Sequence, residues 1–182
     1  IINLIDFAKM ETGEWRLKGE TINLRDFTDA LAREYADEAS VLGRRFVYES
    51  DLSGTENANG DKELLSRVFE NLFSNAFRYT AKGDTVTLHC SRKQADGRET
   101  VLLQLRDTGT GIEKEQMEYI FDPFSRGTRS RREQGFGFGL SIVKSIIEAH
   151  GWEIGVSAEK PEHSTAGKGE TVFSITIPQQ IS

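Results

Sequence analysis

Two asparagines and an arginine recur at helical spacing in the segment ELLSRVFENLFSNAFRYT at 63–80. Asn71, Asn75 and Arg78 stand at i, i+4 and i+7, so a helix would stack them on one polar face beside its apolar arc. Amide oxygens are hard ligands that suit Mg²⁺, and a guanidinium pairs well with phosphate oxygens. The pattern therefore predicts a metal–triphosphate site or, with equal weight, an ordinary solvated helix face.

A second motif, RDTGTGI at 106–112, directly follows an apolar strand pattern. Asp107 would end the strand, and Gly109 and Gly111 would let the backbone approach a ligand closely. A carboxylate here can accept a hydrogen bond from the adenine amine, whereas guanine presents an acceptor at that place and is disfavoured. Taken alone, the motif is more typical of an Asp-Gly turn.

A third motif, GFGFGL at 135–140, precedes the helical pattern LSIVKSIIEAH. Its glycines, Gly135, Gly137 and Gly139, would expose backbone N–H groups at a helix N-terminus, which attracts phosphate. The spacing is not that of a dinucleotide-binding fingerprint, because the third glycine comes one residue early and no strand precedes it. A flexible hinge is the alternative interpretation.

The segment FDPFSRGTRSRREQ at 121–134 joins the second and third motifs. Its length favours a lid over a simple connector, and Phe121, Pro123 and Phe124 are expected to clip its start onto the core. It carries four arginines that would favour a polyphosphate beneath it: Arg126, Arg129, Arg131 and Arg132. Any one of them alone is more typical of a solvated basic loop.

The rest of the chain must supply the elements that position these residues. Periodicity and capping residues predict helices over 24–42 (capped by Asn23), 61–79, 113–120 and 140–150. Strands are expected at 46–50, 85–93, 100–107, 152–159 and 170–178, with a short strand within 53–60. This order is not a strict βαβ alternation. It predicts an α/β two-layer sandwich, with a mixed, mostly antiparallel sheet and helices on one face.

Composition excludes several classes of protein. The 182 residues are 37% hydrophobic and 29% charged, which indicates a soluble domain with a sizeable core. A net charge of −6 argues against nucleic-acid binding. No membrane span or signal peptide is evident, so we expect a cytoplasmic domain, whether or not its parent is membrane-bound. The single Cys90 excludes an internal disulfide and is expected to be buried.

The order and spacing of the motifs closely resemble the N, G1, F and G2 boxes of sensor histidine kinases. These kinases share a superfamily with gyrase, mismatch-repair proteins and a heat-shock chaperone. The matching segments are NLFSNAFRYT, DTGTGI, FDPF and GFGFGLSIVKSIIEAHG. The resemblance covers about residues 15–178 and implies a Bergerat-type fold with a long ATP lid. Residues 1–14 resemble the end of a dimerisation-domain helix and its linker, leaving 15–182 as the catalytic domain of a longer protein.

The resemblance also implies a role for each matching residue. Asn75 would be the principal Mg²⁺ ligand, assisted by Asn71. Arg78 would contact phosphate, and Tyr79 would lie against the adenine. Arg126 takes the place of a lid arginine that can reach the γ-phosphate. The remaining nucleotide contacts would be the adenine acceptor Asp107 with Gly109 and Gly111, the lid residues Gly135, Gly137, Gly139 and Leu140, and Thr171 under the base.

Hydrolysing relatives carry a glutamate as general base four residues before the Mg²⁺ asparagine. Here that position is Asn71, and an amide cannot take up a proton at neutral pH. Glu70 is adjacent but is turned about 100° around the helix. Bound ATP should therefore persist until a nucleophile arrives, which favours phosphoryl transfer over hydrolysis.

No acceptor for the phosphoryl group is evident in the chain. His89 falls in a strand, His150 at a helix C-terminus and His163 in a polar loop, and we expect structural or surface roles for all three. The implied acceptor is a histidine on a dimerisation domain outside this chain, which would be monomeric alone and would serve a response regulator. The alternatives are a degenerate nucleotide-binding regulatory module and a serine kinase of the anti-sigma type; the helical pattern at 1–11 argues against the latter.

The argument from Asn71 can be tested by restoring the missing base. We expect Asn71→Glu to raise the rate of ATP hydrolysis, because a carboxylate can activate water where an amide cannot. Steady-state phosphate release would measure this. Strong hydrolysis by the unmutated chain would contradict the argument.

Overall fold

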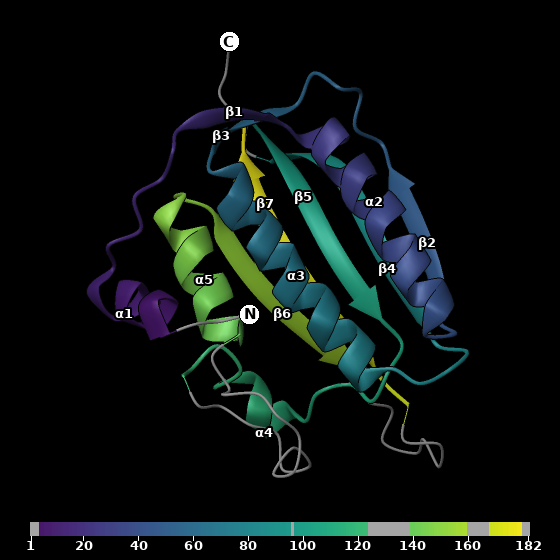
Figure 1. Ribbon diagram of the computed structural model, residues 1–182. Coiled ribbons are helices and arrows are strands. Elements are labelled where there is room, and N and C mark those ends of the chain that lie inside the picture. Colours follow the sequence, from purple (N-terminus) through teal and green to yellow (C-terminus); the bar gives the residue numbers. More distant parts are fainter. Residues whose placement is uncertain (1–3, 96, 124–138, 160–167, 180–182) are drawn as a thin grey trace.

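The computed structural model describes residues 4–95, 97–123, 139–159 and 168–179. Five strands form one sheet in the order β2-β4-β5-β7-β6, and helices α2, α3 and α5 cover one of its faces (Figure 1). The strands are β2 (Arg45–Ser50), β4 (Thr85–Ala95), β5 (Arg98–Asp107), β6 (Glu153–Glu159) and β7 (Glu170–Pro178). The helices are α2 (Leu24–Val41), α3 (Lys62–Tyr79) and α5 (Gly139–Ala149).

The sheet is mixed and mostly antiparallel. Strands β2 and β4 pair in parallel, whereas the β4–β5, β5–β7 and β6–β7 pairs are antiparallel. The predicted two-layer sandwich is thereby confirmed. The parallel pair can exist because β3 (Asn57–Gly60) and α3 intervene between β2 and β4 along the chain, providing the crossover that parallel strands need.

Alternation along the strands separates the two faces of the sheet. In β4, Val86, Leu88 and Cys90 are buried beneath the helices. His89 points to the opposite face, where its Nδ1 lies 3.3 Å from Oε1 of Gln104. Burial also raises the pKa of the Cys90 thiol to about 12, which makes it an inert core residue as expected.

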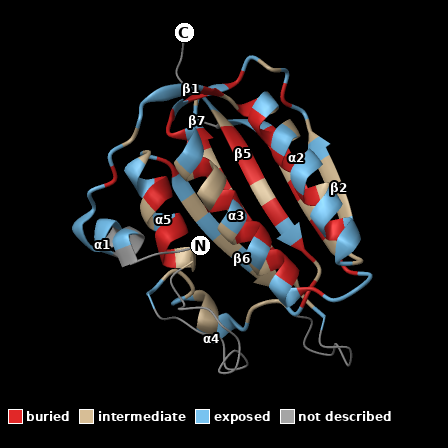
Figure 2. Cartoon of the chain, in the orientation of Figure 1, coloured by how far each residue is buried: buried red, intermediate tan, exposed pale blue. Residues whose placement is uncertain are grey.

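Helix α3 forms the centre of the helical layer. Asp61 caps it, because its carboxylate accepts a hydrogen bond from the Leu64 N–H at 3.1 Å. Its core-facing aromatic residues pack on α2, with the rings of Tyr35 and Phe73 stacked 3.8 Å apart. The helices are accordingly buried on the side facing the sheet and exposed on the other (Figure 2). This packing fixes the height and rotation of α3 over the sheet.

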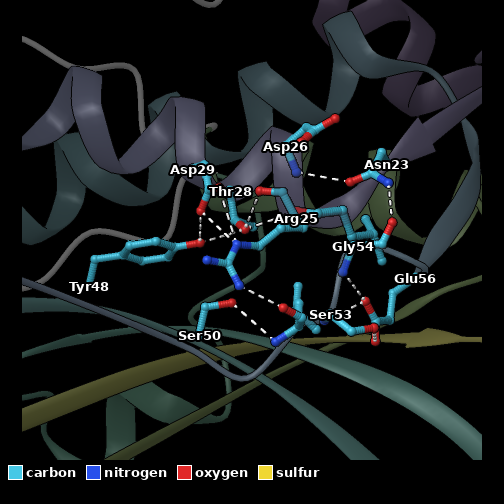
Figure 3. Close-up of polar contacts among 12 residues, drawn as sticks. Asn23, Arg25, Asp26, Thr28, Asp29, Tyr48, Ser50, Ser53, Gly54 and Glu56 are labelled. Carbon is cyan, nitrogen blue, oxygen red and sulfur yellow. Dashed lines mark hydrogen bonds and ion pairs between the residues drawn. The ribbon is translucent and has the colours of Figure 1, made fainter.

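A polar network holds α2 against β2 and the loop that follows it (Figure 3). Arg25 donates to Asp29 at 3.0 Å and to the Leu52 carbonyl at 2.6 Å, and the Tyr48 hydroxyl donates to Asp29 at 2.7 Å. Burial raises the pKa of Asp29, but the hydrogen bonds from Tyr48 and Arg25 outweigh it, so the pKa lies below its ordinary value. The network contains no predicted site residue and serves to fix α2.

The structure differs from the sequence-based expectation in two short elements. Strand β1 (Glu20–Asn23) was not expected, and it forms a separate antiparallel pair with β3 (Asn57–Gly60). Four residues are too few for a periodic signal, so β1 is specified by its partner rather than by its own pattern. Helix α4 (Lys114–Met117) is also shorter than the 113–120 predicted.

The N-terminal segment contacts the domain at α5. Helix α1 (Leu4–Thr12), which includes most of the helical pattern at 1–11, lies beside α5, while its apolar Ile5 is 63% exposed. Trp15 is only 9% exposed, and its indole Nε1 donates to Ser145 Oγ at 2.7 Å. Among the described helices, none is long and apolar enough to cross a membrane.

Trp15 should contribute to the stability of the whole domain. We expect Trp15→Ala to lower the free energy of unfolding by about 3 kcal/mol, since it leaves a cavity against α5. Ser145→Ala, which removes only the hydrogen bond, should cost about 1 kcal/mol. The exposed Ile5→Ala is the matched control. Urea unfolding checks this, and equal effects at Trp15 and Ile5 would contradict it.

Candidate nucleotide-binding site

The predicted site residues come from elements that end or begin at one end of the sandwich. Helix α3 and strand β5 end there, α4 (Lys114–Met117) lies at the same end, and α5 begins there (Figure 1). The N–H of Thr110 donates to the carbonyl of Tyr79 at 3.1 Å, which joins the loop after β5 to the end of α3. Asp107 in turn pairs across the sheet with Thr171 of β7. The structure thus brings Tyr79, Asp107 and Thr171 together from distant parts of the sequence.

The two asparagines of α3 are half-buried, one helical turn apart. The Asn71 amide nitrogen donates to the Arg67 carbonyl at 2.8 Å, so its oxygen is the amide atom left to bind a ligand. Within the described part of the chain, the side-chain amide of Asn75 has no hydrogen-bond partner. Arg78 and Tyr79 are exposed at the end of the helix. This donor set of neutral oxygens with a nearby cation fits a magnesium–phosphate ligand.

Asp107 is a buried carboxylate that pairs with no cationic side chain in the described ranges. It is 5% exposed, and its Oδ1 accepts a hydrogen bond from the Gly109 N–H at 3.0 Å. Burial raises the pKa of Asp107 to about 6, aided by the negative charges of Asp84 and Glu170 and opposed by the Gly109 N–H. An acid held in this way is typical of a functional site, because the fold gains nothing from its charge.

Close backbone contacts explain the glycines of the second motif. A Cβ at Gly109 would lie 2.2 Å from the Tyr79 carbonyl oxygen, and Gly111 has a positive φ of 66°. Gly169 belongs to the same contact, since its N–H donates to the Gly109 carbonyl at 2.7 Å. A Cβ at Gly169 would lie 2.9 Å from the Gly111 Cα. These three glycines let the loop after β5 lie between α3 and the start of β7.

Two ion pairs beside Asp107 were not anticipated from the sequence. Lys168 donates to the buried Asp84 at 2.7 Å, and Arg106 pairs with Glu170. Burial raises the pKa of Asp84, but the bonds from Lys168 and the Ala81 N–H outweigh it and the net shift is downward. Widely separated single charges carry no pattern in a sequence, so only the fold reveals that they surround the site.

Much of the predicted lid lies outside the described residues. This applies to Phe124, Arg126, Arg129, Arg131, Arg132, Gly135 and Gly137. Gly139 and Leu140 form the half-buried first turn of α5. Phe121 lies against Phe173, with ring centroids 6.2 Å apart, as a clip would require. Pro123, however, is exposed, so that part of the predicted clip is wrong.

His150 has the structural role expected of it. Its Nε2 accepts a hydrogen bond from the Asp61 N–H at 3.0 Å, and its Nδ1 lies 2.7 Å from the Ile146 carbonyl. These partners require a neutral ring with the proton on Nδ1, which ties the end of α5 to the start of α3. His89 lies on the open face of the sheet, and His163 is outside the described residues.

The raised pKa of Asp107 predicts a gain in stability when its charge is removed. The folded chain retains the proton up to about pH 6, whereas the unfolded chain loses it near pH 4, so stability falls as pH rises through this window. Asp107→Asn should therefore raise the free energy of unfolding at pH 7 by up to about 3 kcal/mol. Urea unfolding at pH 7 and pH 4 measures this.

The gain should nearly vanish at pH 4, where the native carboxyl is protonated. The matched control is Asp37→Asn on the exposed side of α2, which should change stability by less than about 0.5 kcal/mol. A destabilised Asp107→Asn at pH 7, or a gain independent of pH, would show that the Asp107 charge is not an unfavourable one.

Comparisons with known proteins agree with this geometry. The family model for the histidine kinase-, DNA gyrase B- and HSP90-like ATPases matches residues 60–181. The autoinducer 2 sensor kinase/phosphatase LuxQ of Vibrio parahaemolyticus is 30% identical over 180 residues, covering 97% of this chain and 20% of that protein. Sensor protein SrrB of Staphylococcus aureus is 32% identical over 178 residues, covering 97% and 28%. The chain thus spans less than a third of these relatives.

Solved structures share the fold at lower identity. The mycobacterial sensor histidine kinase MprB has a TM-score of 0.72 and 23% identity, over 90% of this chain and all of that one. Full-length ShkA, solved in complex with AMPPNP, has a TM-score of 0.75 and 22% identity, over 98% and 35%. The fold is thus that of histidine kinase catalytic domains. Since the family model covers more than half of its residues, the chain belongs to the histidine kinase-, DNA gyrase B- and HSP90-like ATPases.

Proposed function

We propose that this chain is the ATP-binding catalytic domain of a two-component sensor histidine kinase. It would transfer the ATP γ-phosphoryl group to a histidine on a separate dimerisation domain. The observation that carries the proposal is the buried carboxylate of Asp107, which no described cation pairs with and which the Thr110–Tyr79 hydrogen bond joins to the helix bearing Asn71 and Asn75. The relatives LuxQ and SrrB are sensor proteins, and ShkA was solved with an ATP analogue.

Adenine recognition would rest on Asp107. The Gly109 N–H occupies one carboxylate oxygen and leaves acceptor capacity on the other for the adenine amine. In its buried position an ionised carboxylate gains much from a single donor, and it would repel the carbonyl that guanine presents. Thr171 pairs with Asp107 across the sheet and would lie under the base, with Tyr79 against it.

The triphosphate and its metal would lie along α3. Asn75, with its amide unengaged among the described residues, would be the principal Mg²⁺ ligand, and Asn71 would assist through its oxygen. Arg78 would pair with phosphate, and the start of α5 at Gly139 and Leu140 would offer N–H groups to it. The lid residues Arg126, Gly135 and Gly137 would complete this side. Mg²⁺ would neutralise phosphate charge, so catalysis would be mostly positioning.

The chemistry at Asn71 favours a kinase over a hydrolase. The Asn71 NH₂ group donates to the Arg67 carbonyl, so the side chain presents its amide oxygen. An amide oxygen is too weak a base to take up a proton at neutral pH. Glu70 is exposed on a different part of the helix. Water beside the γ-phosphate would therefore meet no general base among these residues, and bound ATP would survive until a histidine approaches.

The proposal extends to the parent protein. Residues 1–14 would be the end of a dimerisation helix with its linker, and 15–182 the catalytic domain. The acceptor histidine would lie on that dimerisation domain, the full-length protein would be a homodimer, and its phosphoryl group would pass to the receiver domain of a response regulator. The domain would work on the cytoplasmic side.

Incubation with ATP labelled at the γ-phosphate tests the proposal directly. The chain plus the dimerisation hairpin of its parent should place an acid-labile phosphate on the hairpin. Asn75→Ala should lower the transfer rate by about a hundredfold, because the metal site is weakened. A hairpin whose acceptor histidine is replaced by glutamine should remain unlabelled. Tight ATP binding without label transfer would instead favour a nucleotide-binding regulatory module.

A further inference from the structure

The side chain of Arg44, in the turn between α2 and β2, reaches the end of α3. Its Nη2 donates to the carbonyls of Phe77 at 3.1 Å and Thr80 at 2.7 Å, and its Nε donates to Thr80 Oγ1 at 3.3 Å. The last carbonyls of a helix lack intrahelical partners and carry partial negative charge, so a cation stabilises them. Arg44 therefore caps the helix that carries the predicted metal and phosphate residues.

The carbonyls that Arg44 binds flank Arg78 and Tyr79, the two residues proposed to contact phosphate and adenine. Phe77 precedes this pair and Thr80 follows it. The intervening Tyr79 carbonyl accepts a hydrogen bond from the Thr110 N–H at 3.1 Å. The backbone of the segment is thus fixed from one side by a side chain and from the other by the loop after β5.

Further hydrogen bonds hold Arg44 in place. Its Nη1 donates to the Leu42 carbonyl at 2.6 Å, and its own N–H donates to the Ala39 carbonyl at 2.8 Å. The N–H of the next residue, Arg45, donates to the Asp84 carbonyl at 2.8 Å. Because the Asp84 carboxylate also accepts a hydrogen bond from the Ala81 N–H in the turn after α3, hydrogen bonds join the two turns and Arg44.

We propose that Arg44 is a positioning residue for the nucleotide site. Its planar guanidinium group holds the last turn of α3 against the loop after β5, and thereby orients Arg78 and Tyr79 toward the nucleotide. A lysine ammonium is a point charge and cannot reproduce the two-carbonyl geometry. The inference rests on the proposed ATP-binding function and extends it to a residue outside the sequence motifs.

The test compares Arg44→Gln with Arg45→Gln, a matched variant of the neighbouring exposed arginine. Titration with Mg-ATP, well below each variant's unfolding temperature, should show affinity about tenfold weaker for Arg44→Gln, as expected for loss of a charged hydrogen bond. Arg45→Gln should bind within about twofold of the unmutated chain. Amide exchange without nucleotide should be about tenfold faster at the Thr110 N–H in Arg44→Gln alone.

If Arg44 were only a stabilising cap, its loss would lower the unfolding temperature without acting through Arg78, so the double variant decides between the two roles. If Arg44 acts through Arg78, the fold-loss of Mg-ATP affinity in the double variant Arg44→Gln/Arg78→Gln should be smaller than the product of the fold-losses in the two single variants. A folded Arg44→Gln variant that binds Mg-ATP as tightly as the unmutated chain would overturn the role of Arg44 but not the proposed function. Should Arg44→Gln not fold, Arg44→Lys should show the same weakening, and unchanged affinity there would overturn it.

Failure of the proposed function would look different. An unmutated chain that does not bind Mg-ATP would overturn both the function and the inference that depends on it. Unmutated binding with no effect of either Arg44 variant would leave the function intact and remove only the role of Arg44.

Discussion

The candidate nucleotide site depends on the contact between the loop after β5 and the end of α3. The Thr110 N–H reaches the Tyr79 carbonyl at 3.1 Å, and the approach leaves no room for a side chain at Gly109. A backbone contact this close requires other contacts to hold both elements in place. The aromatic packing of α2 on α3 fixes one, and the central position of β5 in the sheet fixes the other.

The buried charge of Asp107 lowers the stability of the fold at the candidate site. The Asp107 carboxylate is buried at the end of the central strand β5, no cation of the described residues contacts it, and burial raises its pKa to about 6. Nearby carboxylates are instead neutralised by their own partners, Asp84 by Lys168 and Glu170 by Arg106. Of these three carboxylates, Asp107 alone has no cationic partner among the described residues, and its buried charge would strongly attract a ligand donor. The stability of the large core makes such an unfavourable group tolerable.

Long amphipathic helices and alternating strands were predictable because each carries many residues with one period. Helix α3 was expected over 61–79 and spans Lys62–Tyr79, and strand β7 was expected and found at 170–178. The site residues Asn71, Asn75 and Asp107 were selected from motif spacing, and their ligand roles stay predictions. Strand β1 and the burial of Trp15 were missed, because both depend on partners distant in the sequence: β3 and Ser145.

By itself the sequence determined the residue types available for chemistry and the order of the motifs that carry them. It also placed an amide, Asn71, at the position where the resemblance to hydrolysing relatives predicts a general base, since the identity of that side chain is read directly from the sequence. Only the tertiary structure decided how the motifs meet. It paired Asp107 with Thr171, placed Gly169 against Gly109 and brought Arg44 to the end of α3. These contacts join residues far apart in the chain, and their energies depend on distances that no local pattern encodes.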